Sequence, residues 1–276
     1  MMKRLFIQGI LLLSATTAFA QAAEVSQKIE GFNLEGYAES GSKSWDIKGD
    51  KADIVGNQVA VTNVNANSYG DQDMNLTAKQ GTIDKSTGNV KLKQDVVITA
   101  ERGTVMKTDT LDWQRQKDLV RTDDPVTIED KSMHLQGIGM EAHPGLKDAT
   151  LKSDVMADIQ AESNTHKNNR IQITSDGPME IDQNTMTAVF TVNVVATEPA
   201  TGRELKADRM EVLFDEQTRK IKQITCTGNV EVQQGNNITR SENLVYKADE
   251  QRMVLTGRPK LLLDPGDNNA TSAFKF

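Results

Sequence analysis

The residue types that most often perform chemistry are few in this chain and widely spaced. Its histidines, His134, His143 and His166, have no neighbouring His, Cys or carboxylate at a recurring ligand spacing, so no metal site is expected. The sequence has neither a G-x-S-x-G elbow nor a phosphate-binding glycine loop. Carboxylates such as Asp215 and Glu216 fall in predicted hairpin turns, where such residues are common. These observations predict no enzyme activity, no metal and no cofactor.

The single cysteine, Cys226, excludes an internal disulfide. In the segment ITCTGNVEV it shares the predicted strand face of Ile224 and Val230. A free cysteine in such a place is usually a small buried hydrophobe. A redox role would need a partner or a lowered pKa, and the sequence indicates neither.

The elements that position all other side chains come from one repeated pattern. In this pattern, two residues that share a strand face precede a charged turn, and the next apolar residue opens the return strand. The segment from Ala207 to Gly257 contains the pattern twice, and the first half of the chain contains it twice more. The four copies are Ala207, Met210, Val212 and Ile221; Ser241, Leu244, Tyr246 and Met253; Ala78, Gly81, Ile83 and Val90; and Thr108, Leu111, Trp113 and Val120. The chain is therefore predicted to use one β-hairpin unit repeatedly.

Short alternating segments separated by Gly, Asn or Asp continue along most of the chain. This pattern predicts an all-β protein, with an antiparallel sandwich, a jelly roll or a stacked β-roll as the alternatives. Strands should exceed about half of the mature chain, well above the usual 20–25%. Residues 141–160 are ambiguous and fit either a short helix or irregular strands.

The first 20 residues have the pattern of a secretory signal peptide. Lys3 and Arg4 precede a short apolar run, and Ala18-Phe19-Ala20 fits a small-x-small cleavage site. The run is shorter than the roughly 20 residues of a membrane span, although an uncleaved signal anchor is the competing interpretation. The net charge of −7 argues against a nucleic-acid partner, which would require a basic surface.

The aliphatic strand faces are the best functional candidates. Aromatic residues make up only 4% of the chain, so sugar binding by ring stacking is disfavoured. In an ordinary sandwich the two inner faces close on each other as a packed core. If the two faces splay apart, the same residues line a groove that could take acyl chains. Alternation alone does not separate these two cases.

The second half of the chain resembles the LptA (OstA-like) family of periplasmic lipopolysaccharide-transport proteins. The segments that carry the resemblance are Ile173-Thr174-Ser175-Asp176-Gly177-Pro178-Met179, Phe190-Thr191-Val192-Asn193-Val194, Leu205-Lys206-Ala207-Asp208-Arg209-Met210, Thr227-Gly228-Asn229-Val230 and Leu255-Thr256-Gly257-Arg258-Pro259. The family often has Gly-Asn-Val in the second of these segments, and Val192 replaces that glycine here.

The first half resembles the LptC family, whose members receive lipopolysaccharide from an inner-membrane ABC transporter. The segments concerned are Gly41, Trp45-Asp46-Ile47, Lys51-Ala52, Leu76-Thr77-Ala78, Lys107-Thr108-Asp109-Thr110-Leu111, Pro125-Val126-Thr127-Ile128 and Leu135-Gln136-Gly137-Ile138-Gly139-Met140. LptC proteins usually keep an uncleaved transmembrane helix, and Ala18-Phe19-Ala20 departs from that pattern.

The resemblance implies antiparallel β-jellyroll or β-roll modules with a V-shaped apolar groove for lipid A acyl chains. By this resemblance the groove is lined by Phe190, Val192, Val194, Met210, Val212, Leu244, Tyr246, Ile47, Val59, Val61, Ile83, Leu111 and Trp113. The implied partners are lipopolysaccharide, the inner-membrane ABC transporter, other Lpt bridge modules and an LptD-type outer-membrane translocon, docked by sheet-edge stacking. The implied location is the periplasm. A structural β-roll scaffold that binds no lipid is the main alternative.

The predicted layout has five parts: a signal peptide at 1–20, an LptC-like module at 32–160, a linker at 161–170, an LptA-like module at 171–264 and a polar tail at 265–276.

Overall fold

The computed structural model describes residues 26–69, 73–100, 103–143, 147–161 and 170–263. The predicted signal peptide at 1–20 and the polar tail at 265–276 lie outside these ranges. So does the predicted linker at 161–170, apart from its first and last residues. Within the described residues, no helix has the length and apolar character needed to cross a membrane.

The chain forms one antiparallel sheet of 17 strands, so the all-β prediction is confirmed. Strands make up 77% of the described residues, and a single 3₁₀ turn, η1 (Arg115–Lys117), interrupts them. The strands are β1 (Ser26–Tyr37), β2 (Lys43–Val55), β3 (Gln58–Ser68), β4 (Met74–Asp84), β5 (Val90–Ala100), β6 (Val105–Gln114), β7 (Leu119–Glu129), β8 (Met133–His143), β9 (Asp148–Gln160), β10 (Arg170–Ser175), β11 (Met179–Asp182), β12 (Thr187–Glu198), β13 (Arg203–Phe214), β14 (Ile221–Gln234), β15 (Asn237–Lys247), β16 (Arg252–Thr256) and β17 (Lys260–Leu262).

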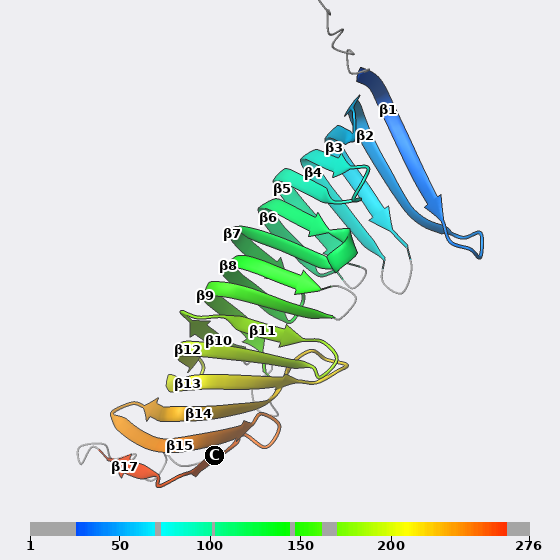
Figure 1. Ribbon diagram of the computed structural model, residues 1–276. Coiled ribbons are helices and arrows are strands. Elements are labelled where there is room, and N and C mark those ends of the chain that lie inside the picture. The colour runs from blue at the N-terminus through cyan, green and yellow to red at the C-terminus, as the bar shows by residue number, and fades with distance from the viewer. Residues whose placement is uncertain (1–25, 70–72, 101–102, 144–146, 162–169, 264–276) are drawn as a thin grey trace, which may run out of the picture.

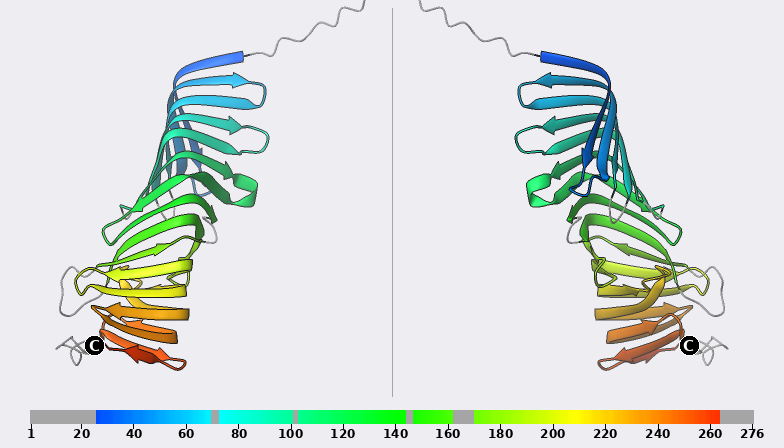
Figure 2. Two further views of the ribbon diagram at one scale, coloured as in Figure 1. Left: turned by 90° about the vertical axis from the view of Figure 1, so that its left-hand side faces the viewer. Right: turned by 90° about the vertical axis from the view of Figure 1, so that its right-hand side faces the viewer.

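The strands stack like rungs from β1 at one end of an elongated molecule to β16 and β17 at the other (Figure 1). Each long strand curves, so the sheet folds over on itself into two walls (Figure 2). The described part of the ambiguous segment 141–160 forms strands. Residues 141–143 are the end of β8, and residues 148–160 are β9. Sheet pairing continues from the first half into the second, because β9 pairs with β10 and β11.

A bulge near the middle of each long strand makes the corner between the two walls. Val61 and Val64 of β3 are both buried although they are three positions apart, a spacing that would point to opposite faces of a flat strand. Between them, Asn63 has a left-handed backbone with φ of 53°. Bulges of this kind bend a strand and increase its twist. The register of most neighbouring strand pairs shifts at the same level.

The number of residues in the corner alternates in two parts of the sheet, from β4 to β9 and from β12 to β15. The two buried residues that flank the corner are four positions apart in β5, β7 and β9, as with Leu92 and Val96. They are three apart in β4, β6 and β8, as with Thr108 and Leu111. The same alternation returns from β12 to β15. Within these two parts of the sheet, every second strand therefore carries one extra corner residue.

Side-chain hydrogen bonds connect the corner of one strand to the neighbouring strand or turn. Three corner asparagines donate to an aspartate of a neighbouring strand or turn: Asn63 Nδ2 to Asp50 Oδ2 at 2.6 Å, Asn193 Nδ2 to Asp176 Oδ2 at 2.7 Å, and Asn229 Nδ2 to Asp208 Oδ2 at 2.9 Å. Asn also adopts the left-handed conformation more readily than most residues. One residue type thus provides both the bend and a hydrogen bond across it.

The predicted turn at Asp176-Gly177-Pro178 is also a corner. It separates β10 from β11, and both half-strands lie between β9 and β12 as one level of the sheet. A Cβ on Gly177 would lie 2.8 Å from the Thr191 carbonyl oxygen, so only glycine fits there. The chain therefore bends at this point without reversing.

The corner also explains the four sequence repeats. The first residue of each copy, such as Ala207, is buried at the corner, and the next two, such as Met210 and Val212, follow on one wall. Sequence alternation identified the wall pair, but the corner residue at a spacing of three looks out of phase in a flat strand. It is the bulge that brings all three to one face.

Val192 is predicted to strain the β12 corner. Thr191-Val192-Asn193-Val194 and Thr227-Gly228-Asn229-Val230 occupy equivalent corners, with φ of 68° at Val192 and 80° at Gly228. A β-branched residue in this region costs roughly 1–2 kcal/mol, and glycine's extra chain entropy offsets about 0.5–1 kcal/mol of the relief. Val192→Gly should therefore raise the free energy of unfolding by up to about 1 kcal/mol, measured by chemical denaturation.

The matched control is Gly228→Val in β14, where a Cβ would lie 2.4 Å from Asp208 Oδ2. That change should lower stability. A Val192→Gly protein no more stable than the parent would show that this corner carries no strain.

Candidate functional site

The inner face of the folded sheet is lined by rows of apolar side chains that cross the strands. On the first wall, cross-strand register connects one row from β1 to β17. Its members are Leu34, Ile47, Ala66, Leu76, Ile98, Met106, Ile128, Leu135, Ala157, Ile173, Ala196, Leu205, Val232, Thr239 and Leu261. Each member directly faces the next on the neighbouring strand.

A second row runs along the other wall. It consists of Ile54, Val59, Ile83, Val90, Trp113, Val120, Ala142, Ala149, Ile181, Ala188, Val212, Ile224, Tyr246 and Met253. Closer to the corner on this wall, another row contains Met140, Leu151, Met179, Phe190, Met210, Cys226, Leu244 and Leu255. Both walls are thus apolar over nearly the whole length of the sheet.

Small side chains occupy the corner where the two walls converge. Buried examples are Val64, Ala78, Val96, Thr108 and Ala207. The hydroxyl of Thr108 hydrogen-bonds that of Thr122 at 3.3 Å, so the polar atoms at this depth have a partner. The partner residues on the second wall are larger, as with Leu92, Leu111 and Met210.

The two halves of the inner face differ in how tightly they close. From Val126 to Ala248 one core cluster fills the space between the walls, and Leu135, Phe190 and Met210 are 0% exposed. The first half has a smaller cluster around Val61 and Leu92, with side chains such as Ile98 only partly buried against it. Apolar side chains are thus partly exposed in the first half and sealed from water in the second.

The structure places all the predicted site residues except Val192 on the inner face. Ile47 lies on the first wall, and Val194 lies at the corner. The second wall carries Val59, Val61, Ile83, Leu111, Trp113, Phe190, Met210, Val212, Leu244 and Tyr246. The predicted shared face of Phe190, Val192 and Val194 was wrong, because Val192 sits in the bulge and is 52% exposed.

Sequence reasoning missed most of the first wall. Apart from Ile47, that row was not predicted, although Leu76, Ile98 and Ile128 contact the same core clusters. The available signal was the apolar residue two positions from each corner residue, as in Leu76 with Ala78 and Ile98 with Val96.

Burial disfavours the charged forms of Cys226 and Tyr246 on the inner face. Burial raises the pKa of the Cys226 thiol to about 12, so the thiol stays protonated and unreactive at neutral pH. Burial also raises the pKa of Tyr246, with a smaller contribution from the Glu198 carboxylate. Among the described residues, no group of three or more His, Cys, Asp or Glu side chains could hold a metal ion.

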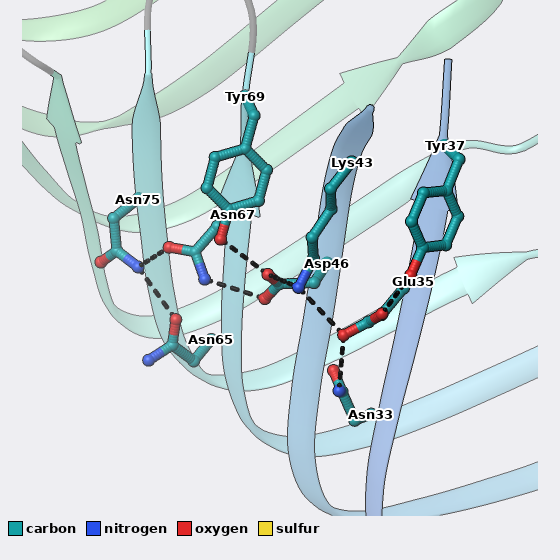
Figure 3. Close-up of polar contacts among 9 residues, drawn as sticks. All are labelled: Asn33, Glu35, Tyr37, Lys43, Asp46, Asn65, Asn67, Tyr69 and Asn75. Carbon is teal, nitrogen blue, oxygen red and sulfur yellow. Dashed lines mark hydrogen bonds and ion pairs between the residues drawn. The ribbon is translucent and has the colours of Figure 1, made fainter. Parts of the chain in front are cut away.

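A polar network covers the outer face of β1–β4 (Figure 3). Asp46 is almost fully buried there, 1% exposed, and accepts hydrogen bonds from Asn67 at 2.9 Å and Tyr69 at 2.7 Å. Lys43 Nζ lies 2.8 Å from Asp46 and 2.9 Å from Glu35. It therefore joins the end strand β1 to β2 and, through Asp46, to β3.

These contacts shift the pKa values of the network. The hydrogen bond from Lys43, followed by those from Asn67 and Tyr69, holds the pKa of Asp46 well below its usual value. For Glu35, the hydrogen bonds from Lys43, Tyr37 and Asn33 lower the pKa from 4.5 to about 2. Both carboxylates are therefore charged in the folded protein at neutral pH.

A hollow of about 510 Å³ lies near the corner of β2–β5. Its lining is largely polar and includes Lys48, Asp50, Asn63 and Lys79. It therefore does not extend the apolar rows of the inner face.

The continuous folded sheet with an aliphatic interior defines a β-jellyroll or β-roll protein whose inner face is apolar along its length. Comparison with known families agrees with this class. The chain belongs to the family described as lipopolysaccharide-assembly, LptC-related, whose model matches residues 11–160. Residues 172–273 match the model described as LptA/(LptD N-terminal domain) LPS transport protein. The predicted order, LptC-like and then LptA-like, is confirmed. No curated protein matched the chain.

Charge loss in the network should loosen the β1 end of the sheet. A carboxylate with a lowered folded pKa stabilises the fold above its unfolded pKa, and that stability is lost as pH falls through the folded pKa. For Glu35 the window runs from about pH 4.5 down to about 2. In a Trp113→Phe protein, the fluorescence of Trp45 on β2 should change within this window, before global unfolding by circular dichroism.

The control variant is Asp46→Asn, which removes the charge that Lys43 pairs with in β2. It should show part of the fluorescence change already at pH 7. A Trp45 signal that follows only the global transition in both proteins would show that the network does not hold β1 separately.

The closed core of the second half makes a further prediction at the β12 corner. Val194 is 1% exposed, so Val194→Asp would bury an unpaired carboxylate at a substantial cost in free energy. We expect this variant to unfold or to melt far below the parent in a thermal scan. Thr191→Asp, on the partly exposed position three residues earlier, should melt close to the parent. Equal melting of the two variants would mean that the second half is open to water.

Proposed function

We propose that this protein is a periplasmic bridge that binds lipopolysaccharide by its acyl chains along the inner face. The observation that carries the proposal is the continuity of apolar rows from one end of the sheet to the other. Each buried methylene contributes about 0.8 kcal/mol, so acyl chains supply affinity without cationic contacts. This suits a chain with a net charge of −7, which would not attract the phosphates.

The open first half is the proposed entry site. Its aliphatic side chains, such as Ile83 and Ile98, are only partly buried and can contact an incoming chain. The proposed path runs from this LptC-like module (32–160), through the 161–170 linker, to the LptA-like module (171–264), away from the inner-membrane ABC transporter and toward the outer membrane. The sequence pattern of residues 1–20 supports export to the periplasm, with an inner-membrane anchor as the alternative.

The proposed docking surfaces are the two ends of the sheet. Among the described residues, β1 pairs only with β2, and β16 and β17 pair only with β15. A strand with one unpaired edge can add another strand by main-chain hydrogen bonds. The ABC transporter complex, other Lpt modules and an LptD-type translocon are the proposed partners at these ends.

A structural β-roll without lipid is the second candidate. The closed core from Val126 to Ala248 favours it, because an ordinary packed core needs no ligand. The two candidates make opposite predictions for the first half.

The discriminating variant is Ile83→Asp on the inner face of β4, with Thr82→Asp on the opposite face as its control. Ile83 is partly exposed, so Ile83→Asp should leave the protein folded while placing a charge in the acyl-chain path. We expect intact-mass analysis after mild extraction to find lipid with the parent and Thr82→Asp, and much less with Ile83→Asp. Equal or absent lipid in all three would support the structural β-roll.

A further inference from the structure

The closed second half poses a physical problem for any ligand that travels the whole inner face. Side chains at 0% exposure, including Leu135, Ile173 and Phe190, leave no path between the walls beyond β8. Packed interiors have voids too small for an acyl chain. A chain bound in the first half could therefore continue only if the two walls separate.

Besides the corner, a main-chain β-bridge joins the two walls at their free margins, opposite the corner. We call this open side of the fold its mouth. Ala161 follows directly after β9 and forms an isolated parallel bridge with Ile221, the first residue of β14. All sheet pairings between the strands are antiparallel, so this bridge lies outside the regular ladder. Ala161 stands at the free margin of the first wall, whereas Ile221 stands at the free margin of the second.

The margins are well covered where this bridge occurs. Ala161 and Ile171 are each 5% exposed, and Ile221 and Ala248 are 0% exposed. In the first half the corresponding margin includes Trp113, which is 39% exposed. The Ala161–Ile221 bridge thus lies within the closed part of the inner face, which begins at β7.

We infer that the second half is a closed form of the lipid path, held shut across its mouth by the Ala161–Ile221 bridge, which must open before an acyl chain passes beyond β8. This inference rests on the proposed function. Two features make opening feasible. Ala161 contributes only a methyl group to the contact, and the bridge stands apart from the ladder, so it can break without unpairing the strands of the sheet.

The chain is well suited to a disulfide test of this inference. Cys226 is its only cysteine and is buried, with its pKa raised to about 12, so it gives little background reaction. Neighbouring strands lie about 4.8 Å apart, within the Cα separation that disulfides span. Ala161→Cys with Ile221→Cys should therefore form a reversible lock in the closed state.

The experiment compares lipid contact before and after the bridge in cells. A photocrosslinking residue is placed at Ile83 in β4 or at Leu255 in β16, both partly buried on the inner face. In the oxidised double-cysteine protein we expect lipopolysaccharide labelling at Ile83 to persist and labelling at Leu255 to be lost. Reduction should restore labelling at Leu255, and each single-cysteine variant should label both positions under either condition.

A second variant opens the bridge instead of locking it. Ala161→Asp places a charge at a covered margin, so labelling at Leu255 should exceed that of the parent while the thermal transition is kept. Persistent labelling at Leu255 in the oxidised protein, or no gain in Ala161→Asp, would overturn the inference. Loss of labelling at both Ile83 and Leu255 in the parent would instead refute the proposed function itself.

Discussion

The rest of the structure depends on bending a single sheet at one line of bulges. A flat sheet has two equivalent faces, but a sheet folded at the middle of each strand encloses one of them. Residues three or four positions apart, such as Val61 with Val64 and Phe190 with Val194, then point to the same side. The cost is a left-handed backbone at several corners, a conformation that Asn and Gly adopt with least strain. The apolar interior, its small-residue corner and its two walls all follow from this bend.

Much of the fold was predictable because alternation is a local property. Pairs such as Met210 with Val212 and Leu244 with Tyr246 indicate, from the sequence alone, both a strand and the face that points inward. The corner was not predictable in the same way. Asp176-Gly177-Pro178 has turn residues whether the chain reverses or only bends, and pairing of β10 and β11 with the same two neighbours decides between them. Val192 was assigned to the wrong face because strict alternation ignores the bulge.

The apolar residues of the second wall were predictable from the sequence, but the separation of the two walls was not. Whether two apolar walls touch or stand apart depends on how far they splay over many strands, a non-local quantity that no short segment encodes. Ile83 and Val212 belong to the same cross-strand row, yet one is partly exposed and the other is 0% exposed. Their local sequences have the same repeat. The difference arises from what covers each margin, including Ala161 against Ile221.

The alternating length of the corners constrains how such a chain can grow or shrink. From β4 to β9 and from β12 to β15 long and short corners alternate, so these parts of the sheet keep their pattern only when strands are added two at a time. β3 and β4 both have short corners, so the alternation starts at β4. After that it fails at one place, where β9, the β10–β11 level and β12 have three long corners in succession. That place lies where the match to one family ends, at residue 160, and the match to the other begins, at residue 172. The number of corner residues thus marks the junction between two segments, each with its own run of alternating long and short corners.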